Sequence, residues 1–319
     1  MTGGCGFIGS QFVRSALAEA LPGVEVSALT VIDALTYAGN LANLELVSTD
    51  PRLRVVRGSI TDAQLLAELL VDVDVVVNFA AETHVDRSID AAAAFVATNV
   101  AGAQTLFESV RHSSVRRLVH VSTDEVYGDI EHGSWTEACP LEPNSPYAAS
   151  KAAADLFARA YAVTHELPVV VTRCSNNYGP FQFPEKVIPL FVTNLLDGIA
   201  VPLYGDGRNI RDWLHVEDHC LGIAVALLNG SDGAIYNIGG GTELSNRDLT
   251  NRILEALECT WDSVTWVSDR PGHDRRYSVD DTALRALGYT PVRDFDTGLA
   301  QTIAWYQQNQ AWWRPLVRR

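Results

Sequence analysis

The sequence predicts an α/β fold in which a doubly wound parallel sheet carries a smaller C-terminal lobe. Apolar runs of strand length alternate with helical patterns through the first 180 residues. Continuous Val, Leu and Ile runs between helices are typical of parallel strands that are covered on both faces. After Gly179-Pro180 the pattern changes to segments rich in proline and glycine, with a tryptophan-rich end. We therefore expect residues 1–180 and 208–239 to form the main domain, and residues 181–207 and 240–319 to form the lobe.

The expected elements follow in chain order. Helical periodicity indicates helices over residues 10–20, 62–70, 91–112 and 146–165. Apolar runs bounded by turn residues indicate strands over residues 28–32, 53–57, 74–79, 118–121 and 168–174. A later apolar run, 234–238, precedes three glycines and is expected to return to the main sheet.

Composition limits the possible partners. The 319 residues carry a net charge of −15 and a pI near 4.9, which argues against nucleic acid and anionic membranes as partners, because both require a basic face. The five cysteines are scattered without a CxxC pair, so neither a disulfide framework nor a metal site is expected. No signal peptide or long apolar run is present, which makes the cytoplasm the expected compartment.

The N-terminal glycines indicate a dinucleotide site. Gly4, Gly6 and Gly9 satisfy G-x-G-x-x-G, and Gly3 with Gly6 and Gly9 satisfies the related G-x-x-G-x-x-G. Such glycines let the backbone approach a pyrophosphate at a helix N-terminus, as in the Rossmann fold. Asp33 ends the next apolar run, where an acid binds the adenosine ribose and repels a 2′-phosphate. The pattern therefore favours NAD over NADP.

The start of the chain is unusual for this fold. The glycine motif should follow a strand, yet only Met1 and Thr2 precede Gly3. That strand is central in a doubly wound sheet, so we expect residues to be missing upstream rather than the fold to differ.

Tyr147 and Lys151 form Y-x-x-x-K on one face of the predicted helix, and Ser122-Thr123 ends an earlier strand. A phenol is a poor base because its ordinary pKa is about 10. The Lys151 ammonium and the positive nicotinamide of NAD⁺ favour the phenolate and lower the pKa of Tyr147. Thr123 can hydrogen-bond the same substrate hydroxyl. This arrangement predicts removal of a carbinol proton while hydride leaves for NAD⁺.

Several further segments carry a family resemblance. They are residues 2–9, 33–40, 80–88, 122–128, 145–147, 173–180, 184–186, 204–207, 211–213 and 269–274. On these segments the chain resembles the extended short-chain dehydrogenase/reductases and, within them, the dTDP-glucose 4,6-dehydratases. The resemblance runs over nearly the whole chain. The triplet Thr123-Asp124-Glu125 distinguishes this subgroup from related epimerases and decarboxylases, which lack adjacent acids there.

The resemblance implies a reaction that uses both acids. Oxidation at C4 of the sugar makes a ketone that acidifies the C5 proton. Loss of water across C5–C6 then needs a base at C5 and an acid at the C6 hydroxyl. By resemblance, Glu125 is the base and Asp124 is the acid, and hydride finally returns to C6. The expected product is a 4-keto-6-deoxy sugar nucleotide made from dTDP-glucose.

The resemblance also implies the binding residues. Those expected at the cofactor, besides Tyr147 and Lys151, are Gly3, Gly6, Phe7, Ile8, Gly9, Asp33, Leu35, Thr36, Gly39, Ser59, Ile60, Ala80, Ala81, Thr98 and Cys174. Those expected at the substrate are Thr83, Thr123, Asn177, Lys186, Pro202, Tyr204, Arg211, Asn246, Arg270 and His273. Asn99 is expected near the cofactor or sugar. Ser59 departs from the family, which usually has Asp near the adenine.

Two further expectations complete the prediction. Lys151 and Lys186 are the only lysines among 24 basic residues, which favours functional roles for both. By resemblance, helices 91–112 and 146–165 pair with those of a second copy as a four-helix bundle, so a homodimer is expected. A nucleotide-sugar 4-epimerase or UDP-sugar dehydratase is the nearest alternative function, and a cofactor-binding sensor without turnover is an alternative of another class.

Overall fold

The main sheet contains the strands β1 (Leu29–Asp33), β2 (Leu53–Arg57), β3 (Val75–Asn78), β4 (Arg117–Thr123), β5 (Val169–Cys174) and β9 (Ile235–Ile238) in the computed structural model, which describes residues 1–317. β2 pairs with β1, and β3, β4, β5 and β9 pair in that order, all in parallel. Thr2 forms parallel bridges to Ile32 of β1 and to Asn78 of β3, and so joins the two groups of strands. The predicted doubly wound fold is confirmed, with Thr2 at the position of the central strand.

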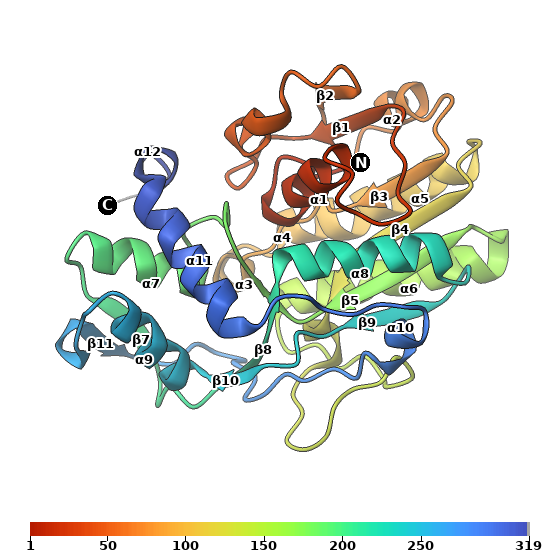
Figure 1. The fold of residues 1–319 in the computed structure, drawn as a ribbon. Coiled ribbons are helices and arrows are strands. Elements are labelled where there is room, and N and C mark those ends of the chain that lie inside the picture. The colour runs from red at the N-terminus through yellow and green to blue at the C-terminus, as the bar shows by residue number, and fades with distance from the viewer. Residues whose placement is uncertain (318–319) are drawn as a thin grey trace.

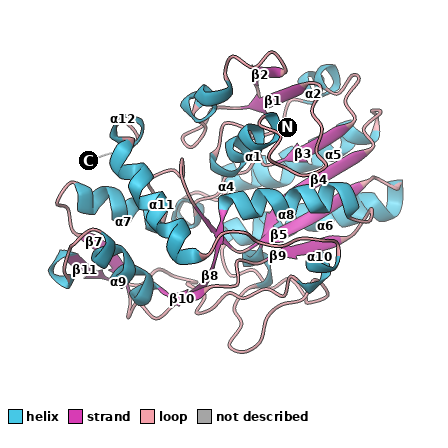
Figure 2. Ribbon diagram, viewed as in Figure 1, coloured by secondary structure: helices cyan, strands magenta, loops and turns pink. Residues whose placement is uncertain are grey.

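Helices cover both faces of this sheet (Figures 1 and 2). α1 (Phe7–Leu17) and α8 (Val216–Asn229) contact each other on one face. α2 (Ala63–Leu69), α5 (Ala103–Arg111) and α6 (Pro146–His165) cover the other face. Each face has its own buried apolar cluster. The carboxyl ends of β1, β3, β4 and β5 therefore meet at one edge, where a doubly wound sheet binds its ligands.

The smaller lobe packs beside that edge, at the left of Figure 1. β8 (Ile210–His215) pairs in parallel with β6 (Asn176–Tyr178) and in antiparallel with β10 (Glu243–Ser245), and β7 (Val201–Tyr204) pairs in parallel with β11 (Val264–Val267). The helices α7 (Val187–Leu196), α9 (Asn246–Ala256), α11 (Phe295–Gln308) and α12 (Gln310–Trp313) enclose a third apolar cluster that contains Trp213 and Trp313. α10 (Thr282–Ala286) instead contacts α8 and β9. The predicted division of the chain into two domains stays a prediction.

Local sequence explains the helix that carries Tyr147 and Lys151. Ser145 caps α6 by accepting a hydrogen bond from the Ala148 N–H, and Pro146 occupies the first turn, where it has no N–H to satisfy. The helix ends at Glu166, whose φ of 53° is left-handed. α6 spans the predicted residues 146–165.

Other predicted elements need adjustment. The first helix begins at Phe7 rather than at residue 10, because the glycine turn leads directly into it. The predicted helix 91–112 is divided into α4 (Ala93–Phe95), the π-helix η2 (Val96–Gly102) and α5. Periodicity misses such a division because a π-turn adds only one residue per turn. The run 234–238 does return to the main sheet, where β9 pairs with β5.

The remaining short elements are η1 (Leu41–Val47), α3 (Val85–Asp90), η3 (Asp124–Tyr127) and η4 (Trp261–Ser263). All five cysteines have free thiols. Among residues 1–317 no group of three or more His, Cys, Asp or Glu side chains is arranged to hold a metal ion. Within the same residues no helix has the length and apolar character needed to cross a membrane.

Candidate active site

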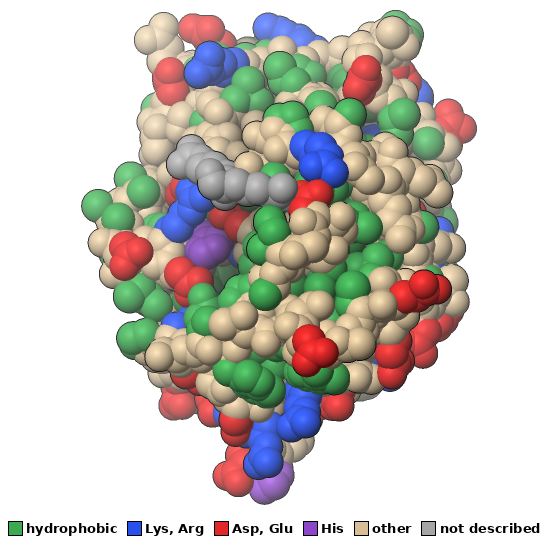
Figure 3. Space-filling model, turned by 90° about the vertical axis from the view of Figure 1, so that its left-hand side faces the viewer, with side chains coloured by type: hydrophobic (Ala, Val, Ile, Leu, Met, Phe, Trp, Pro, Cys, Tyr) green, Lys and Arg blue, Asp and Glu red, His purple; other side chains and the backbone are tan. Residues whose placement is uncertain are grey.

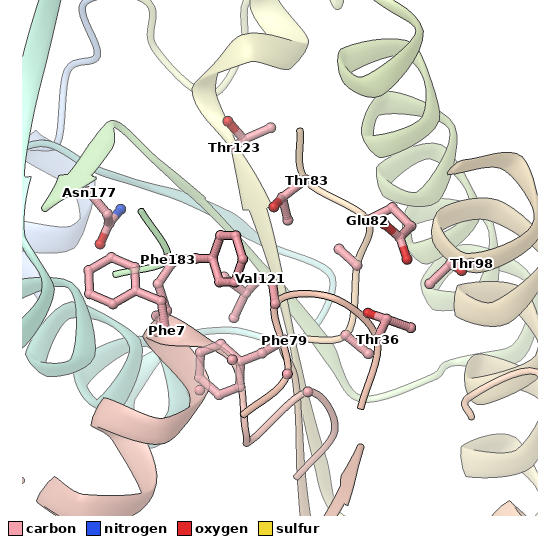
Figure 4. Close-up of a pocket in the computed structure, with 18 of the residues that line it drawn as sticks. Phe7, Thr36, Phe79, Glu82, Thr83, Thr98, Val121, Thr123, Asn177 and Phe183 are labelled. Carbon is pink, nitrogen blue, oxygen red and sulfur yellow. The ribbon is translucent and has the colours of Figure 1, made fainter. Parts of the chain in front are cut away.

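The glycine loop and Asp33 form one end of a cavity of about 370 Å³ at the carboxyl edge of the main sheet. The Asp33 carboxylate accepts hydrogen bonds from the Cys5 N–H and the Leu35 N–H, both at 2.8 Å. These bonds fix the acid beside the start of α1. Phe7 at the start of α1, Thr36 after β1 and Thr123 at the end of β4 surround the same space (Figure 4).

Two glycines of the loop have no room for a side chain. A Cβ on Gly9 would lie 2.3 Å from the Gly3 carbonyl oxygen, and a Cβ on Gly3 would lie 2.6 Å from the Ala80 backbone nitrogen. Gly3 also has a φ of 64°, which favours glycine. The bare backbone at the N-terminus of α1 fits a pyrophosphate, and Asp33 fits a ribose diol. The residues present therefore fit NAD.

Most predicted cofactor residues line this cavity. The lining residues among them are Gly3, Gly6, Phe7, Ile8, Gly9, Asp33, Thr36, Gly39, Ser59, Ile60, Ala80, Ala81, Thr98, Tyr147, Lys151 and Cys174. Leu35 is not among them, because its side chain packs against the apolar cluster under α1. Its backbone N–H instead holds Asp33. Leu35 therefore contributes to the site by holding Asp33 with its backbone N–H, and the type of its side chain could not indicate this role.

The three adjacent residues Thr123, Asp124 and Glu125 lie where β4 passes into η3. Thr123 caps this short 3₁₀ helix, since its hydroxyl oxygen accepts a hydrogen bond from the Glu125 N–H at 3.3 Å. The Thr123 hydroxyl also donates to Asp124 Oδ1 at 3.3 Å. The other Asp124 oxygen is buried and has no hydrogen-bond partner in the described chain. The tight turn thus directs both carboxyl groups to the end of the cavity.

Tyr147 and Lys151 approach the same point from α6. Both side chains are buried, and Lys151 Nζ donates to the Val121 carbonyl oxygen at 2.7 Å. Burial raises the pKa of Tyr147 well above its ordinary value, and the Glu125 charge adds to this effect while Thr123 opposes it. The lowered pKa expected for Tyr147 includes the positive charge of the nicotinamide and stays a prediction. Within the chain, Lys151 gives its hydrogen bond to the Val121 carbonyl oxygen.

The two adjacent acids have different surroundings. Burial raises the pKa of Asp124 well above its ordinary value, and the neighbouring carboxylates of Glu125 and Asp212 add to it. Burial also raises the pKa of Glu125, but Lys186, Arg270 and Arg211 oppose the rise. Arg211 lowers the pKa of both acids, so the contrast is that carboxylates favour the protonated form of Asp124 whereas Lys186 and Arg270 favour the carboxylate form of Glu125.

A second cavity of about 630 Å³ lies between the main domain and the lobe. The predicted substrate residues on its wall are Lys186, Pro202, Tyr204, Arg211, Asn246, Arg270 and His273. Thr83, Thr123 and Asn177 line the first cavity instead. Figure 3 shows the face of the lobe, where acidic, basic and histidine side chains gather in a hollow.

The basic residues of this second cavity fit an anionic ligand. Arg211 is buried, donates to the carbonyl oxygens of Ile210 and Asp274, and lies 4.1 Å from the centre of the Tyr277 ring. Arg270 pairs with Asp86 at 3.2 Å, and its buried Nε has no hydrogen-bond partner within the described residues. An unsatisfied buried donor is costly unless a ligand accepts from it. A diphosphate would supply that acceptor.

The two cavities meet at the reactive side chains. Glu125 and Lys186 line both of them, as do Asn176, Phe183 and Glu185. Lys186 Nζ donates to the Thr83 carbonyl oxygen at 2.9 Å, which ties the lobe to the loop after β3. A nucleotide sugar that occupies the second cavity would extend its sugar past Glu125 towards the first.

Sequence reasoning missed several residues around this junction. Arg87 lies 3.7 Å from the centre of the Tyr37 ring and 3.3 Å from Glu185, so these three residues connect distant loops. Tyr37, Arg87 and Glu185 all lie in the segments that carry the family resemblance, which was the available signal. Residues 315–317 also line the second cavity. No local motif indicated this, because α11 and α12 bring the segment there.

Asn99 does not line either cavity. It is buried in the π-helix η2, where its side chain exchanges two hydrogen bonds with the backbone of Glu82, at 2.8 and 2.9 Å, and donates to Ser150 at 2.8 Å. Asn99 thus holds the loop after β3 against α6. The expectation that Asn99 lies near the cofactor or sugar stays a prediction, and its side chain is engaged with Glu82, which lines the first cavity.

Comparisons with known proteins extend these observations. The family model of GDP-mannose 4,6 dehydratase matches residues 1–302. A dTDP-glucose 4,6-dehydratase of Streptomyces antibioticus is 58% identical over 321 residues, which cover 100% of this chain and 95% of the relative.

Solved structures agree with the sequence relatives. The dTDP-glucose 4,6-dehydratase DesIV of Streptomyces venezuelae, determined with NAD bound, has a TM-score of 0.98 and 60% identity, covering 99% of this chain and 98% of the other. A UDP-glucose 4-epimerase of Thermus thermophilus in complex with NAD has a TM-score of 0.88 but only 30% identity, covering 97% and 98%. The fold is common to both activities, whereas the sequence is much more similar to the dehydratases.

Proposed function

Because the chain belongs to the GDP-mannose 4,6 dehydratase family and, within it, to the dTDP-glucose 4,6-dehydratases, we infer that it is a hydro-lyase that converts dTDP-glucose to dTDP-4-keto-6-deoxyglucose. NAD is its cofactor. The observation that carries this function is the pair Asp124 and Glu125 at the junction of the cofactor and substrate cavities, with Tyr147 and Lys151 beside them.

The residues around Tyr147 are assigned to the oxidation. Tyr147 accepts the proton of the C4 hydroxyl, and the Thr123 hydroxyl hydrogen-bonds the same oxygen. NAD supplies the redox chemistry, since it accepts the hydride from C4 and later returns it to C6. Tyr147 must already be a phenolate to accept this proton, and the Lys151 ammonium offsets the negative charge of that phenolate. Because burial opposes that charge, a nearby permanent cation is needed at this stage.

The two acids are assigned to the elimination. Glu125 removes the C5 proton, which the C4 ketone has acidified. Asp124 gives its proton to the departing C6 hydroxyl, so that water leaves. The surroundings of the two acids support this division, because two carboxylates and one cation act on Asp124, whereas three cations and one carboxylate act on Glu125. Glu125 then returns a proton to C5 as hydride reaches C6. Tyr147 does not return its proton to the sugar, because the product keeps the C4 ketone.

The proton balance closes without another reactant. The proton that Tyr147 takes from the C4 hydroxyl must reach Asp124, which gave one to the departing hydroxyl. Thr123 lies between them, since it donates to Asp124 and hydrogen-bonds Tyr147. We assign to Thr123 this transfer as well as substrate binding.

The nucleotide is assigned to the second cavity. Arg211, Arg270 and Lys186 suit the diphosphate, while Pro202 and Tyr204 suit the faces of the thymine ring. His273 lies 6.2 Å from Tyr204, ring centre to ring centre, and its Nδ1–H donates a hydrogen bond to the Asp269 carboxylate at 2.5 Å. These roles come from the family motifs and from the position of each side chain on the cavity wall.

Product formation tests the function directly. The purified protein is incubated with dTDP-glucose, and the alkaline absorbance of a 4-keto sugar nucleotide is followed. Product from dTDP-glucose supports the proposal. Product from UDP-glucose alone would assign the chain to a UDP-sugar dehydratase, conversion to a C4 epimer would assign it to the epimerases, and no change in any sugar would favour a sensor.

We also propose that two copies pair through α5 and α6. Exposed apolar side chains gather on η2 and α6, at Val96, Leu156, Phe157 and Val163, with exposures of 55, 58, 39 and 72%. A surface of this kind is unfavourable in water unless it is covered. Analytical ultracentrifugation at micromolar concentration should give a dimer, and L156E with V163E should give a monomer. A monomeric parent protein would contradict the proposal.

A further inference from the structure

Beneath the reactive tyrosine and lysine, α6 carries a third polar residue on the same face. Tyr147, Lys151 and Asp155 follow one another at intervals of four residues, so all three face the sheet. The Asp155 side chain is only 1% exposed. An acid at such a position is rare unless a partner holds its charge.

Lys151 itself has little direct support for its charge. Its ammonium donates to the neutral carbonyl oxygen of Val121 at 2.7 Å. Burial lowers the pKa of Lys151, and the charges that oppose this are those of Asp155 and Cys174. Since burial also raises the pKa of the Cys174 thiol, that group is neutral near pH 7. Asp155 is then the anion that supports the ammonium.

Asp155 is held by β5 and lies near a histidine of β4. Arg173 of β5 donates from Nε to Asp155 Oδ2 at 2.8 Å, and its own side chain is 3% exposed. The other carboxylate oxygen, Oδ1, lies 3.9 Å from His120 Nε2 of β4 and has no hydrogen-bond partner in the described residues. Burial raises the pKa of Asp155, whereas Arg173 and Lys151 lower it.

The hydrogen-bond chain behind His120 determines which of its ring nitrogens carries the proton. Thr2 donates its hydroxyl to Asn78 Oδ1, so the Asn78 amide nitrogen is the atom that faces His120. That nitrogen donates to His120 Nδ1 at 2.9 Å. Nδ1 therefore accepts, and the ring proton lies on Nε2, towards Asp155. Burial keeps His120 neutral by lowering its pKa.

We propose that Asp155 is a positioning residue for the inferred dehydration: held by Arg173, its carboxylate is the counter-ion of Lys151, four residues before it on the same buried face of α6. This proposal rests on the proposed function only where it predicts an effect on turnover. The electrostatic coupling between Asp155 and Lys151 is a property of the folded chain and can be measured without a substrate.

The titratable and charged groups near Lys151 determine in which direction its pKa should shift when the Asp155 charge is removed. Those that line the cavity with Lys151 include Tyr147, Asp124, Glu125 and Cys174, and those that join or approach Asp155 are Arg173 and His120. Among them, Asp155 and Cys174 are the groups whose charges act on Lys151. Removing the Asp155 charge leaves Lys151 and Arg173 as two buried cations on this side.

The scarcity of lysine allows a direct measurement. Because Lys151 and Lys186 are the only lysines in the chain, lysine labelled with ¹³C at Cε gives two signals, which K186R assigns. The NAD-loaded protein is titrated by NMR. In D155N the midpoint of Lys151 should fall by about one pH unit. The Lys186 midpoint should stay in place and is the internal control.

A second variant separates charge from structure. R173Q removes a cation and leaves the Asp155 carboxylate, so it should move the Lys151 midpoint to higher pH, opposite to D155N. D155E should restore the parent midpoint. An unchanged midpoint in D155N, or shifts in the same direction in D155N and R173Q, would overturn the proposal. If D155N does not fold, the direction of the R173Q shift decides alone.

The same variants link the counter-ion to turnover. Turnover requires a protonated Lys151, so the alkaline limb of the kcat/KM profile should move to lower pH in D155N and to higher pH in R173Q. A wild-type chain that makes no 4-keto product would contradict the proposed function, while the NMR midpoints would still test the counter-ion. If the Lys151 midpoints move as expected but the alkaline limbs of the kcat/KM profiles do not, Asp155 has only a structural role, and its part in turnover is overturned.

Discussion

The two halves of the site are built differently. In the cofactor half, the binding groups come from short stretches of chain and are largely backbone, as in the glycine loop and the N–H groups that hold Asp33. In the substrate half, long side chains from distant segments converge. Lys186 precedes α7, Arg211 lies on β8, and Arg270 lies in the loop after β11.

This difference affects how each half responds to change. A backbone site depends on close approach, so adding one carbon atom is enough to destroy it. A site of converging side chains shares its binding energy among several groups, so losing one of them weakens binding without abolishing it. The reactive acids lie at the boundary, where backbone geometry places them and distant charges set their protonation.

The largest effect is expected from G9A in the cofactor half. The added Cβ would lie 2.3 Å from the Gly3 carbonyl oxygen, so the loop must move. We expect no bound NAD after gel filtration and no turnover. G133A is the control for an added methyl group outside the site, since a Cβ on Gly133 would meet nothing within 4 Å, although its φ of 77° also favours glycine. NAD retained at the parent level in G9A would show that the loop is more adaptable than its contacts imply.

At the boundary between the halves, E125Q should lower kcat by about 10²–10⁴-fold, because a general base is removed. C4 oxidation should continue, so NADH should accumulate after substrate is added. D124N should also slow turnover, by retaining the C6 hydroxyl. E131Q alters an exposed acid beyond η3 and should change nothing. Normal turnover in E125Q would reassign the base.

In the substrate half, R270Q should raise KM by about ten- to a hundredfold, the range for one charged hydrogen bond. Arg270 also lowers the pKa of Glu125, so without it that pKa rises and the acidic limb of the rate profile moves to higher pH. R275Q is the matched control, because Arg275 is half-exposed and pairs with Asp206 outside both cavities. An unshifted acidic limb in R270Q would show that Arg270 does not influence the pKa of Glu125.

The smallest effect concerns the joint between the halves. His219 of α8 is buried, its Nδ1 lies 2.9 Å from Asn177 Oδ1, and burial lowers its pKa to about 3. The unfolded chain binds a proton there near pH 6.5, so His219 destabilises the fold as pH falls from 6.5 towards 3. Between pH 6.5 and 5.5 this costs about 1 kcal/mol, because the unfolded histidine is only half protonated at the start of that interval.

H219Q removes that titration. Its free energy of unfolding, measured with denaturant, should therefore decline less than that of the parent between pH 6.5 and 5.5. The comparison cancels the other titrating groups, which both proteins share. H112Q is the control, since His112 is exposed on α5. Equal acid dependence in H219Q and the parent would show that His219 is not a buried neutral group.

The sequence by itself determined the cofactor half and the reactive residues. A glycine turn, an acid after the next strand and Y-x-x-x-K have short-range spacings, and regular elements convert such spacings into geometry. For the same reason α6 and most strands lie where their patterns predicted. The family motifs then connected Asp124 and Glu125 to elimination.

Only the tertiary structure decided how these residues are charged. Asp124 and Glu125 are neighbours in sequence, yet Asp212 raises the pKa of Asp124 while Lys186 and Arg270 lower that of Glu125, and Arg211 lowers both. The surroundings of the Asp155 carboxylate on α6 are likewise set by Arg173 and His120, which lie on the strands β5 and β4. Protonation depends on burial and on charges across space, and neither is a local property of the chain.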